Sequence, residues 1–288
     1  MTVAREPDGL ERKPRAVAIG TFDGVHRGHR QVLRAALDAG ATATAVTFDP
    51  HPREAFGYQV ELISTLERRL ELLAEAGIED VLIVRFDEQT ALTEAEEFAE
   101  SVLRAIGAEV VLAGANFRFG HGRRGDLALL RELGFDARAV PIVEGISSST
   151  IRQVVHAGDV GAAARLLGRP VELDGTVVHG DARGSILGYP TANLRLHPSL
   201  LVPGHGIYAG AALGRPAAIS IGTNPHYGGD ERRVEAFLLD FEGDLYGDRL
   251  LVEVWERLRD EAAFDDEAAL VEQIGRDVAA TRAATRPG

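Results

Sequence analysis

The sequence of 288 residues contains no cysteine. This absence excludes disulfide bonds, thiolate metal sites and cysteine nucleophiles, and it is typical of proteins in a reducing compartment. Any metal ion must therefore be bound through oxygen or histidine ligands. The N-terminal segment carries Arg5, Glu6 and Asp8 instead of the apolar core of a signal peptide, so we expect the protein to be cytoplasmic.

Lysine is nearly absent as well, because Lys13 is the only lysine among 31 basic residues. We therefore expect every buried cation to be an arginine. No GxxxxGK[ST] loop occurs in the sequence, which excludes P-loop chemistry for any reaction with ATP.

Long apolar runs and basic clusters are also missing. No run approaches the roughly 20 residues of a membrane-spanning helix. The net charge is −13, and no basic cluster is longer than the pair Arg123-Arg124. This acidic balance argues against nucleic acid or an anionic membrane as a partner and favours small-molecule substrates.

The first half of the chain alternates strand and helix patterns. Apolar strands are predicted at 16–20, 42–48, 80–85, 109–113 and 136–142. Capping boxes at 64–67 and 93–96 indicate helix starts, and Gly77, Gly107 and Gly134 indicate helix ends. Such a βαβ series predicts an α/β, Rossmann-like domain whose ligands bind beyond the carboxyl ends of parallel strands.

The stretch 16–33, AVAIGTFDGVHRGHRQVL, reads as a buried strand, a glycine turn and a helix whose apolar spacing starts at Arg30. A turn of this kind leaves backbone N–H groups free at the positive end of the helix dipole. His26 and His29 are three residues apart and share one face of the first helical turn. We predict that they bind a phosphate; the plainer interpretation is a tight turn with two solvated histidines.

Three further polar loops follow predicted strands, at 49–52 (DPHP), 114–120 (GANFRFG) and 147–152 (SSSTIR). The serine run predicts an N-cap for a helix through His156, and Arg152 on its first turn would form a second anion site facing the same edge as His29. Arg152 could equally be a solvated side chain on a capped helix. The prolines of 49–52 could simply stiffen a turn.

The loop at 114–120 also has two interpretations. Asn116 is a candidate ligand-binding residue, because it follows a strand at the predicted edge of the sheet. It could instead be an ordinary turn residue, with Phe117 and Phe119 in the core.

Beyond Pro170 the pattern changes, after a helix predicted at 159–167 and ending at Gly168. Short β-rich runs appear at 171–179, 206–213, 216–222, 233–241 and 250–257. About six strands of this length fit a small closed antiparallel barrel, with the amphipathic helix 267–284 on its outside. We predict two domains, 1–170 and 171–288.

The second domain carries chemistry of its own. The glycine-bearing loop 179–184 can approach a polyphosphate, and GYPTAN follows at 188–193. In an extended segment Thr191 and Asn193 place their side-chain oxygens on one face, where neutral oxygens suit Mg²⁺ that already carries phosphates. The alternative is an ordinary turn with polar residues.

Glu235 shares one face of a predicted strand with Phe237, whereas Val234 lies on the other face. A single carboxylate in this environment could act as a general base. It could equally be the exposed salt-bridge partner of Arg233 or Arg249.

The motifs GTFDGVHRGH, FDPHP, GANFRFG, SSSTIR, GYPTANL and the stretch from VEAFLLDF to DLYG occur in this order. Together they resemble the bacterial bifunctional riboflavin kinase/FMN adenylyltransferase family, often called FAD synthetases, over nearly the whole chain. GxFDGxHxGH alone is typical of a wider nucleotidyltransferase superfamily, whereas GYPTAN is similar to the narrower signature of riboflavin kinases.

The resemblance implies that the first domain joins FMN and ATP to give FAD and pyrophosphate, and that the second phosphorylates riboflavin to FMN. Two alternatives remain: a different small-molecule adenylyltransferase with an appended barrel, and a flavin-sensing binding protein without turnover. Retention of the two histidines, the Thr-x-Asn pair and the glutamate disfavours the binding protein, since binding alone requires neither a metal pair nor a base.

The resemblance also implies roles for individual residues. The catalytic residues would be His26, His29, Arg152 and Glu235. The ATP-binding residues would be Gly20, Phe22, Gly24, Gly28, Asn116, Ser148, Gly180 and Gly184. The loop Asp49, Pro50, His51 and Pro52 would bind flavin, and Thr191 and Asn193 would hold Mg²⁺ or Mn²⁺. The chain departs from the family at Ser149 and His226, where threonine is usual, and His226 leaves the flavin contacts there open.

Overall fold

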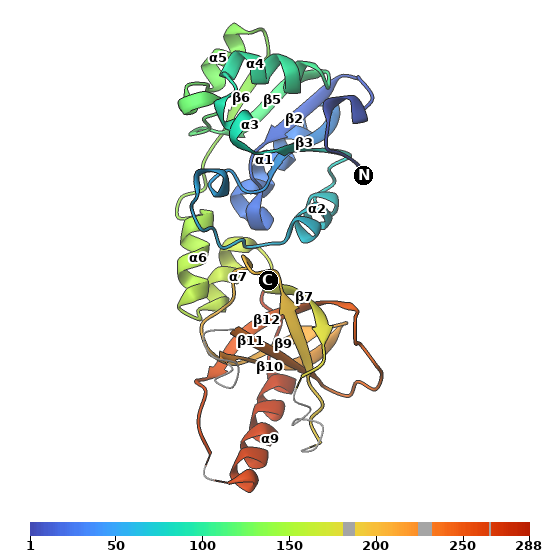
Figure 1. The fold of residues 1–288 in the computed structure, drawn as a ribbon, viewed down its shortest axis with the longest axis vertical. Coiled ribbons are helices and arrows are strands. Elements are labelled where there is room, and N and C mark those ends of the chain that lie inside the picture. Colours follow the sequence, from blue (N-terminus) through green and yellow to red (C-terminus); the bar gives the residue numbers. More distant parts are fainter. Residues whose placement is uncertain (181–187, 224–231, 265) are drawn as a thin grey trace. The chain divides into compact units, whose positions relative to one another are not determined.

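The computed structural model describes residues 1–180, 188–223, 232–264 and 266–288. The chain divides into two compact units (Figure 1). The first unit is Met1–Val60 with Leu66–Ser147, and the second is Glu61–Thr65 with Ser148–Gly288. This division falls earlier in the chain than residue 170. The boundary between the two predicted activities therefore stays a prediction.

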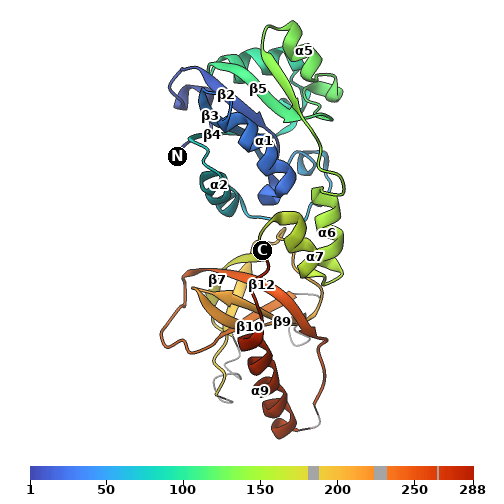
Figure 2. The ribbon, with the colours of Figure 1, turned by 180° about the vertical axis from the view of Figure 1, so that it is seen from behind.

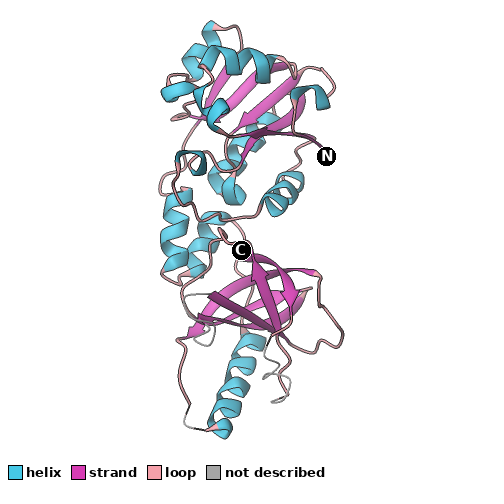
Figure 3. Cartoon of the chain, in the orientation of Figure 1, coloured by secondary structure: helices cyan, strands magenta, loops and turns pink. Residues whose placement is uncertain are grey.

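The first unit contains six parallel strands in the order β1-β4-β3-β2-β5-β6. Figure 3 draws the strands in magenta and the helices in cyan. The six strands are β1 (Thr2–Ala4), β2 (Arg15–Ile19), β3 (Thr42–Asp49), β4 (Asp80–Arg85), β5 (Ala108–Gly114) and β6 (Asp136–Val140). The five strands predicted from apolar runs are confirmed. The sequence reading missed β1, because three residues are too few to show a period.

Helices cover both faces of this sheet. They are α1 (Arg27–Leu37), α2 (Leu66–Glu75), α3 (Glu88–Leu92), α4 (Ala95–Phe98), which continues as a π-helix through Arg104, and α5 (Leu127–Glu132). Alternation along β2 separates two cores: Val17 packs in a cluster with Leu103, whereas Ala18 packs in a cluster with Leu33 and Leu72. The predicted α/β architecture is confirmed.

The predicted helix ends are confirmed, since Gly77, Gly107 and Gly134 all have positive φ. The capping box at 93–96 is wrong. Glu94 is the N-cap of α4 and makes no side-chain capping bond. The Thr93 hydroxyl instead donates to the carbonyl of Gln89 at 3.1 Å, which closes the end of α3.

Arginine supplies the buried cations, as expected. Nη1 of Arg15, which is fully buried, donates to Oδ2 of Asp80 at 2.5 Å, and its Nε donates to the Ile106 carbonyl at 2.8 Å. Lys13 also pairs with Asp80 at 3.2 Å but stays partly exposed. The buried arginines of the described residues are Arg15, Arg68, Arg69 and Arg169.

The second unit is built on a closed antiparallel barrel in the order β10-β11-β8-β7-β12-β9, which confirms the predicted barrel. Its strands are β7 (Val171–Val178), β8 (Ala192–Leu196), β9 (Gly206–Ala212), β10 (Arg215–Thr223), β11 (Arg232–Leu238) and β12 (Arg249–Arg259). The C-terminal helix α9 (Glu267–Ala283) packs against β9 and β10, also as predicted.

Two helices before the barrel belong to the same unit. They are α6 (Ser148–His156) and α7 (Val160–Leu167), which lie side by side (Figure 2). Ile151, Val155 and Leu167 are buried in the same cluster as the barrel interior. The core of the second unit therefore extends beyond the barrel itself. No described helix is long and apolar enough to cross a membrane.

Candidate active sites

The turn after β2 holds an unusual backbone. Phe22, Gly24 and Val25 have φ of 49°, 74° and 38°, so three residues of a four-residue stretch adopt left-handed conformations. Phe22 is 1% exposed and packs in the core, where its ring meets the His29 ring edge-on with centroids 5.3 Å apart. A Cβ on Gly20 would lie 3.4 Å from the Phe22 ring, so these two of the predicted ATP-binding residues lie close together.

His26 and His29 lie together at the start of α1, as the spacing predicts. Their rings stack with centroids 3.6 Å apart and an interplanar angle of 15°. A Cβ on Gly28 would be 3.2 Å from the His26 ring, so glycine allows this ring to cover the backbone. His26 is only 6% exposed, and the interpretation as two solvated histidines is therefore wrong for it.

Two details differ from the sequence prediction. The helix begins at Arg27, three residues before the predicted start, because His26 acts as its N-cap. Nδ1 of His26 accepts the backbone N–H of His29 at 3.2 Å, so this N–H is not free for a ligand.

The His29 side chain is held neutral. Burial, followed by the neighbouring charges of His26 and Arg69, lowers the pKa of His29 well below its usual value. Nδ1 of His29 is buried and has no hydrogen-bond partner among the described residues. A neutral imidazole can donate one N–H to an oxyanion without the cost of burying a second cation.

Arg69 on α2 is a candidate site residue that the sequence reading missed, since its charge acts on His29. It is 2% exposed, and its Nη1 donates to the carbonyl of Phe48 at the end of β3 at 3.0 Å. Burial lowers the pKa of Arg69 from its usual value. Three carboxylates oppose this shift, those of Asp23, Asp49 and Glu54. The available signal is its place three and four residues before Leu72 and Leu73, on the apolar side of the helix.

The predicted flavin loop follows β3 directly. The Asp49-Pro50 peptide bond is cis, and the carboxylate of Asp49 lies 3.5 Å from a guanidinium nitrogen of Arg5. Nδ1 of His51 accepts the backbone N–H of Arg53 at 3.2 Å. The loop is therefore a structured turn, as its plainer interpretation holds, and its role in flavin binding stays a prediction.

Asn116 follows β5 and is exposed. It lies in a turn closed by the N–H of Phe117 and the carbonyl of Gly114, 2.9 Å apart. Phe117 stacks on Phe119, whose ring is buried. The turn-and-core interpretation describes this geometry correctly, and the contact of Asn116 with ATP stays a prediction.

Ser148 is the first residue of α6, and Arg152, the fifth residue, lies on the second turn of this helix and not on the predicted first turn. Nε of Arg152 donates to the carbonyl of Glu61 at 2.6 Å, and Nε2 of His156 lies 2.5 Å from Oε2 of the same residue. These contacts join the segment Glu61–Thr65 to α6. The predicted role of Arg152 beside His29 stays a prediction.

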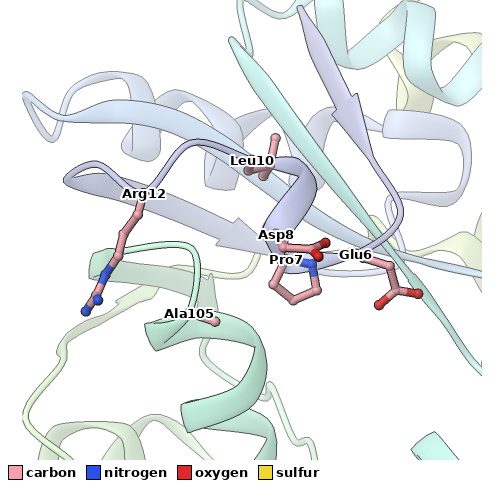
Figure 4. Close-up of a pocket in the computed structure, with 6 residues that line it drawn as sticks. All are labelled: Glu6, Pro7, Asp8, Leu10, Arg12 and Ala105. Carbon is pink, nitrogen blue, oxygen red and sulfur yellow. The ribbon is translucent and has the colours of Figure 1, made fainter.

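A surface hollow of about 460 Å³ occurs elsewhere in the first unit (Figure 4). It is lined by Glu6, Pro7, Asp8, Leu10, Arg12 and Ala105. Ala105 lies just before β5 begins, so the hollow is at the amino end of that strand. It contains none of the predicted site residues.

In the second unit, Asn193 and Glu235 face each other across neighbouring strands. Asn193 of β8 is the register partner of Glu235 on β11. Their neighbours Leu194 and Val234 are buried in the barrel core, so Asn193 and Glu235 lie on the outer face. Opposed residues of an antiparallel pair have Cβ atoms about 5 Å apart. The barrel therefore brings a neutral amide oxygen and a carboxylate together.

Arg233 completes this cluster. It forms an ion pair with Glu235, and its Nε donates to Oδ1 of Asn193 at 3.4 Å. Of the two arginines considered as partners of Glu235, the structure thus selects Arg233. Arg249 instead pairs with Asp174 at 2.7 Å.

The phosphate loop of this domain is described only in part. His179 and Gly180 are described, whereas Gly184 and His226 lie outside the described residues. A Cβ on Gly180 would lie 2.2 Å from Nδ2 of Asn193, so only glycine lets the backbone come this close to the amide. Thr191 immediately precedes β8 and is partly buried.

The chemistry of these groups fits a hard divalent cation. Among the described residues, no three His, Cys, Asp or Glu side chains gather closely enough to hold a metal ion. The neutral oxygens of Thr191 and Asn193 beside a side-chain-free backbone at Gly180 suit Mg²⁺ that brings most of its ligands as phosphate and water. Metal binding here stays a prediction.

Comparison with known proteins identifies both halves of the chain. The family model for FAD synthetase matches residues 10–152, and the model for riboflavin kinase matches residues 167–285. The bifunctional riboflavin kinase/FMN adenylyltransferase of Escherichia coli K12 is 36% identical over 300 residues, covering 96% of each chain. The enzyme of the same name from Bacillus subtilis 168 is 32% identical, covering 93% of this chain and 91% of its own length.

One solved structure matches both units. It is a crystal structure described as a macrolide-efflux protein from Streptococcus pneumoniae, with 31% identity and a TM-score of 0.88. The match covers 98% of this chain and 99% of that chain. The two-unit fold therefore recurs in a protein that has been solved by crystallography.

Proposed function

The chain belongs to the family of bifunctional riboflavin kinase/FMN adenylyltransferases, and on this premise we propose which of its residues perform each reaction. The enzyme phosphorylates riboflavin with ATP to give FMN, and it adenylylates FMN with ATP to give FAD and pyrophosphate. The observation that carries this function is the pair of family matches, one on each half of the chain.

In adenylyl transfer, a phosphate oxygen of FMN attacks the α-phosphorus of ATP, and pyrophosphate leaves. We assign the ATP phosphates to the turn between β2 and α1, formed by Gly20, Phe22, Gly24 and Gly28. His29 would donate an N–H to the oxygens on which charge increases in the transition state, and His26 would orient it through their stacked rings. The neutral state of His29 supports this role, because the group needs no proton transfer to act.

Arg69 would act on the same site through its positive charge. Its buried guanidinium contacts the end of β3 and contributes positive potential at His29. Asn116 and the flavin loop 49–52 stand at the ends of β5 and β3, the two strands that flank β2, so we assign them to ATP and FMN respectively. Ser148 and Arg152 are assigned to ATP binding and to transition-state alignment.

In riboflavin phosphorylation, the terminal hydroxyl of the ribityl chain attacks the γ-phosphorus of ATP, and ADP leaves. Glu235 would take the hydroxyl proton, and Thr191 and Asn193 would hold Mg²⁺ or Mn²⁺ on the phosphates. The metal would supply charge neutralisation for the transferred group. Gly180 and Gly184 would let the backbone approach the polyphosphate.

Incubation of the purified chain with riboflavin, ATP and Mg²⁺ tests the function, with the products separated by chromatography. FMN should appear first and FAD second, and FMN with ATP alone should give FAD and pyrophosphate. Binding of flavin without turnover would support a flavin-sensing protein. Unchanged riboflavin, together with adenylylation of another acceptor, would support a different adenylyltransferase. The cytoplasmic location and the absence of nucleic-acid and membrane partners stay predictions.

A further inference from the structure

Arg233 contacts both groups to which the phosphorylation reaction is assigned. Its Nη2 forms an ion pair with Oε1 of Glu235, and its Nε donates to Oδ1 of Asn193 at 3.4 Å. One guanidinium thus lies against the assigned base and against the assigned metal-ligating oxygen. The side chains of Arg233 and Glu235 are 31% and 22% exposed, so this pair is partly shielded from water.

The barrel fixes this arrangement. Arg233 and Glu235 are two residues apart on β11 and therefore share its outer face. Gly222 of β10 is the register partner of Arg233, and a Cβ there would be 2.1 Å from Oε1 of Glu261. Because Gly222 has no side chain, the carboxylate of Glu261 can lie on the same part of the outer face as the guanidinium of Arg233.

We propose that Arg233 is a resident counter-cation of the phosphorylation site. Before the metal–nucleotide complex binds, Arg233 neutralises Glu235 and occupies the oxygen of Asn193. When the complex enters, Arg233 leaves Asn193, and the carboxylate of Glu235 is uncovered for the hydroxyl. This inference rests on the roles assigned above to Asn193 and Glu235.

The physical reason is competition between cations. A guanidinium keeps its charge throughout the working pH range, so Arg233 can vacate the site only by moving. Even with the full screening of bulk water, two like unit charges about 4 Å apart weaken binding by roughly fivefold, and a unit charge beside a divalent ion weakens it by roughly 30-fold. Arg233 should therefore set the metal concentration that riboflavin phosphorylation requires, and it should not affect FMN adenylylation.

The test uses Arg233→Gln, which removes the charge and retains a polar side chain. The Mg²⁺ concentration for half-maximal riboflavin phosphorylation should fall roughly 10-fold. Calorimetric titration of the full chain with Mg·ADP should show one class of sites bound roughly 10-fold more tightly, with any other class unchanged. Arg233→Lys retains a cation without the planar fork and should lie between Gln and wild type.

Arg195→Gln is the matched control, because it removes an equal charge from the same face of β8, two residues beyond Asn193. It should change the Mg²⁺ requirement by less than twofold. The fluorescence of Trp255 on β12 checks that the second unit of each variant is folded, and FMN adenylylation checks the first unit. If Arg233→Gln does not fold, the Mg²⁺ requirement of Arg233→Lys is compared with that of wild type instead.

The outcomes separate the two levels of the argument. Unchanged metal affinity in Arg233→Gln, with Asn193→Ala raising the Mg²⁺ requirement and Glu235→Gln lowering kcat, overturns only the role of Arg233. Weaker Mg·ADP binding by Arg233→Gln overturns it as well, since the arginine would then contact phosphate. Normal behaviour of Asn193→Ala and Glu235→Gln would overturn the site assignment itself.

Discussion

The two candidate sites treat a phosphate substrate in opposite ways. In the first unit, a turn of left-handed backbone and two stacked imidazoles present a neutral donor, and Nδ1 of His29 has no partner in the described part of the chain. In the second, charged side chains on the outer face of a barrel are already paired with one another. On the roles proposed above, the first site would receive an anion as it stands, whereas the second would have to be rearranged by its ligand.

This difference follows from how each site is built. The first is formed by one continuous stretch between β2 and α1, and the charge of the buried Arg69 on α2 acts on its His29. The second takes its residues from separate strands, and the register of β8 and β11 aligns them. The barrel site should therefore depend more on the integrity of its whole unit.

The largest effect should come from shortening the second unit. A fragment of 171–288 lacks α6 and α7, whose Ile151, Val155 and Leu167 are buried with the barrel core. Each buried side chain stabilises by about 1.5–3 kcal/mol, so 171–288 should be less stable than 148–288 by roughly 5 kcal/mol. Urea unfolding followed by the fluorescence of Trp255, the only tryptophan, measures this. Equal midpoints would show that the barrel is independent of α6 and α7.

The next effect isolates the barrel chemistry. Glu235→Gln should lower kcat for riboflavin phosphorylation by about 10²–10⁴-fold, because an amide cannot accept the hydroxyl proton. FMN adenylylation by the same preparation serves as the internal control and should be unchanged. A near-normal kcat would return Glu235 to the role of a salt-bridge partner of Arg233.

The reciprocal variant tests the first unit. His29→Ala should lower FMN adenylylation by at least ~10²-fold, as expected for the loss of one donor to a developing charge. Riboflavin phosphorylation should stay near wild type, and steady-state assays of both reactions measure the contrast. Equal loss of the two activities is the outcome that the two-site description does not allow.

The smallest effect concerns pH. The folded state lowers the pKa of His29, so the unfolded chain, with a pKa of about 6.5, binds more protons. The resulting stabilisation is present above pH 6.5 and is lost as pH falls toward the folded pKa, at up to about 1.4 kcal/mol per pH unit. Urea unfolding followed by circular dichroism at pH 5 to 7.5 should show this loss.

His29→Gln is the matched control, since glutamine does not titrate in this range. The variant should show a smaller acid loss in the circular dichroism transition, whereas the Trp255 transition, which reports the second unit, should be the same as in wild type. Identical acid profiles of the two proteins would remove His29 as the source of the effect.

Much of the first site could be predicted from sequence because it is local. The strand, the glycine turn and the three-residue spacing of His26 and His29 are all visible in one stretch. Arg69 could not be assigned in the same way, because its contact with the carbonyl of Phe48 depends on how α2 docks on β3. An arginine on the apolar side of a helix is a signal of burial but does not reveal its partner.

The barrel site was less accessible to sequence reasoning. The alternation of residues along β11 predicts its two faces, and it correctly places Glu235 on the face opposite to Val234. The choice between Arg233 and Arg249 as the partner of Glu235 required three-dimensional information, because Arg249 forms an ion pair with Asp174. The capping box at 93–96 failed for a related reason: Thr93 closes the preceding helix, a competition that a four-residue motif does not reveal.

The scarcity of lysine has a practical consequence. Lys13 pairs with Asp80 and stays partly exposed, and it precedes β2 at the amino end of the sheet. Amine-directed coupling at moderately alkaline pH can therefore attach the chain only through this side chain or through the α-amino group. The turn that carries His26 and His29 follows the opposite end of β2. The enzyme could thus be tethered to a solid support in a uniform orientation, with the loop that we assign to ATP facing the solution.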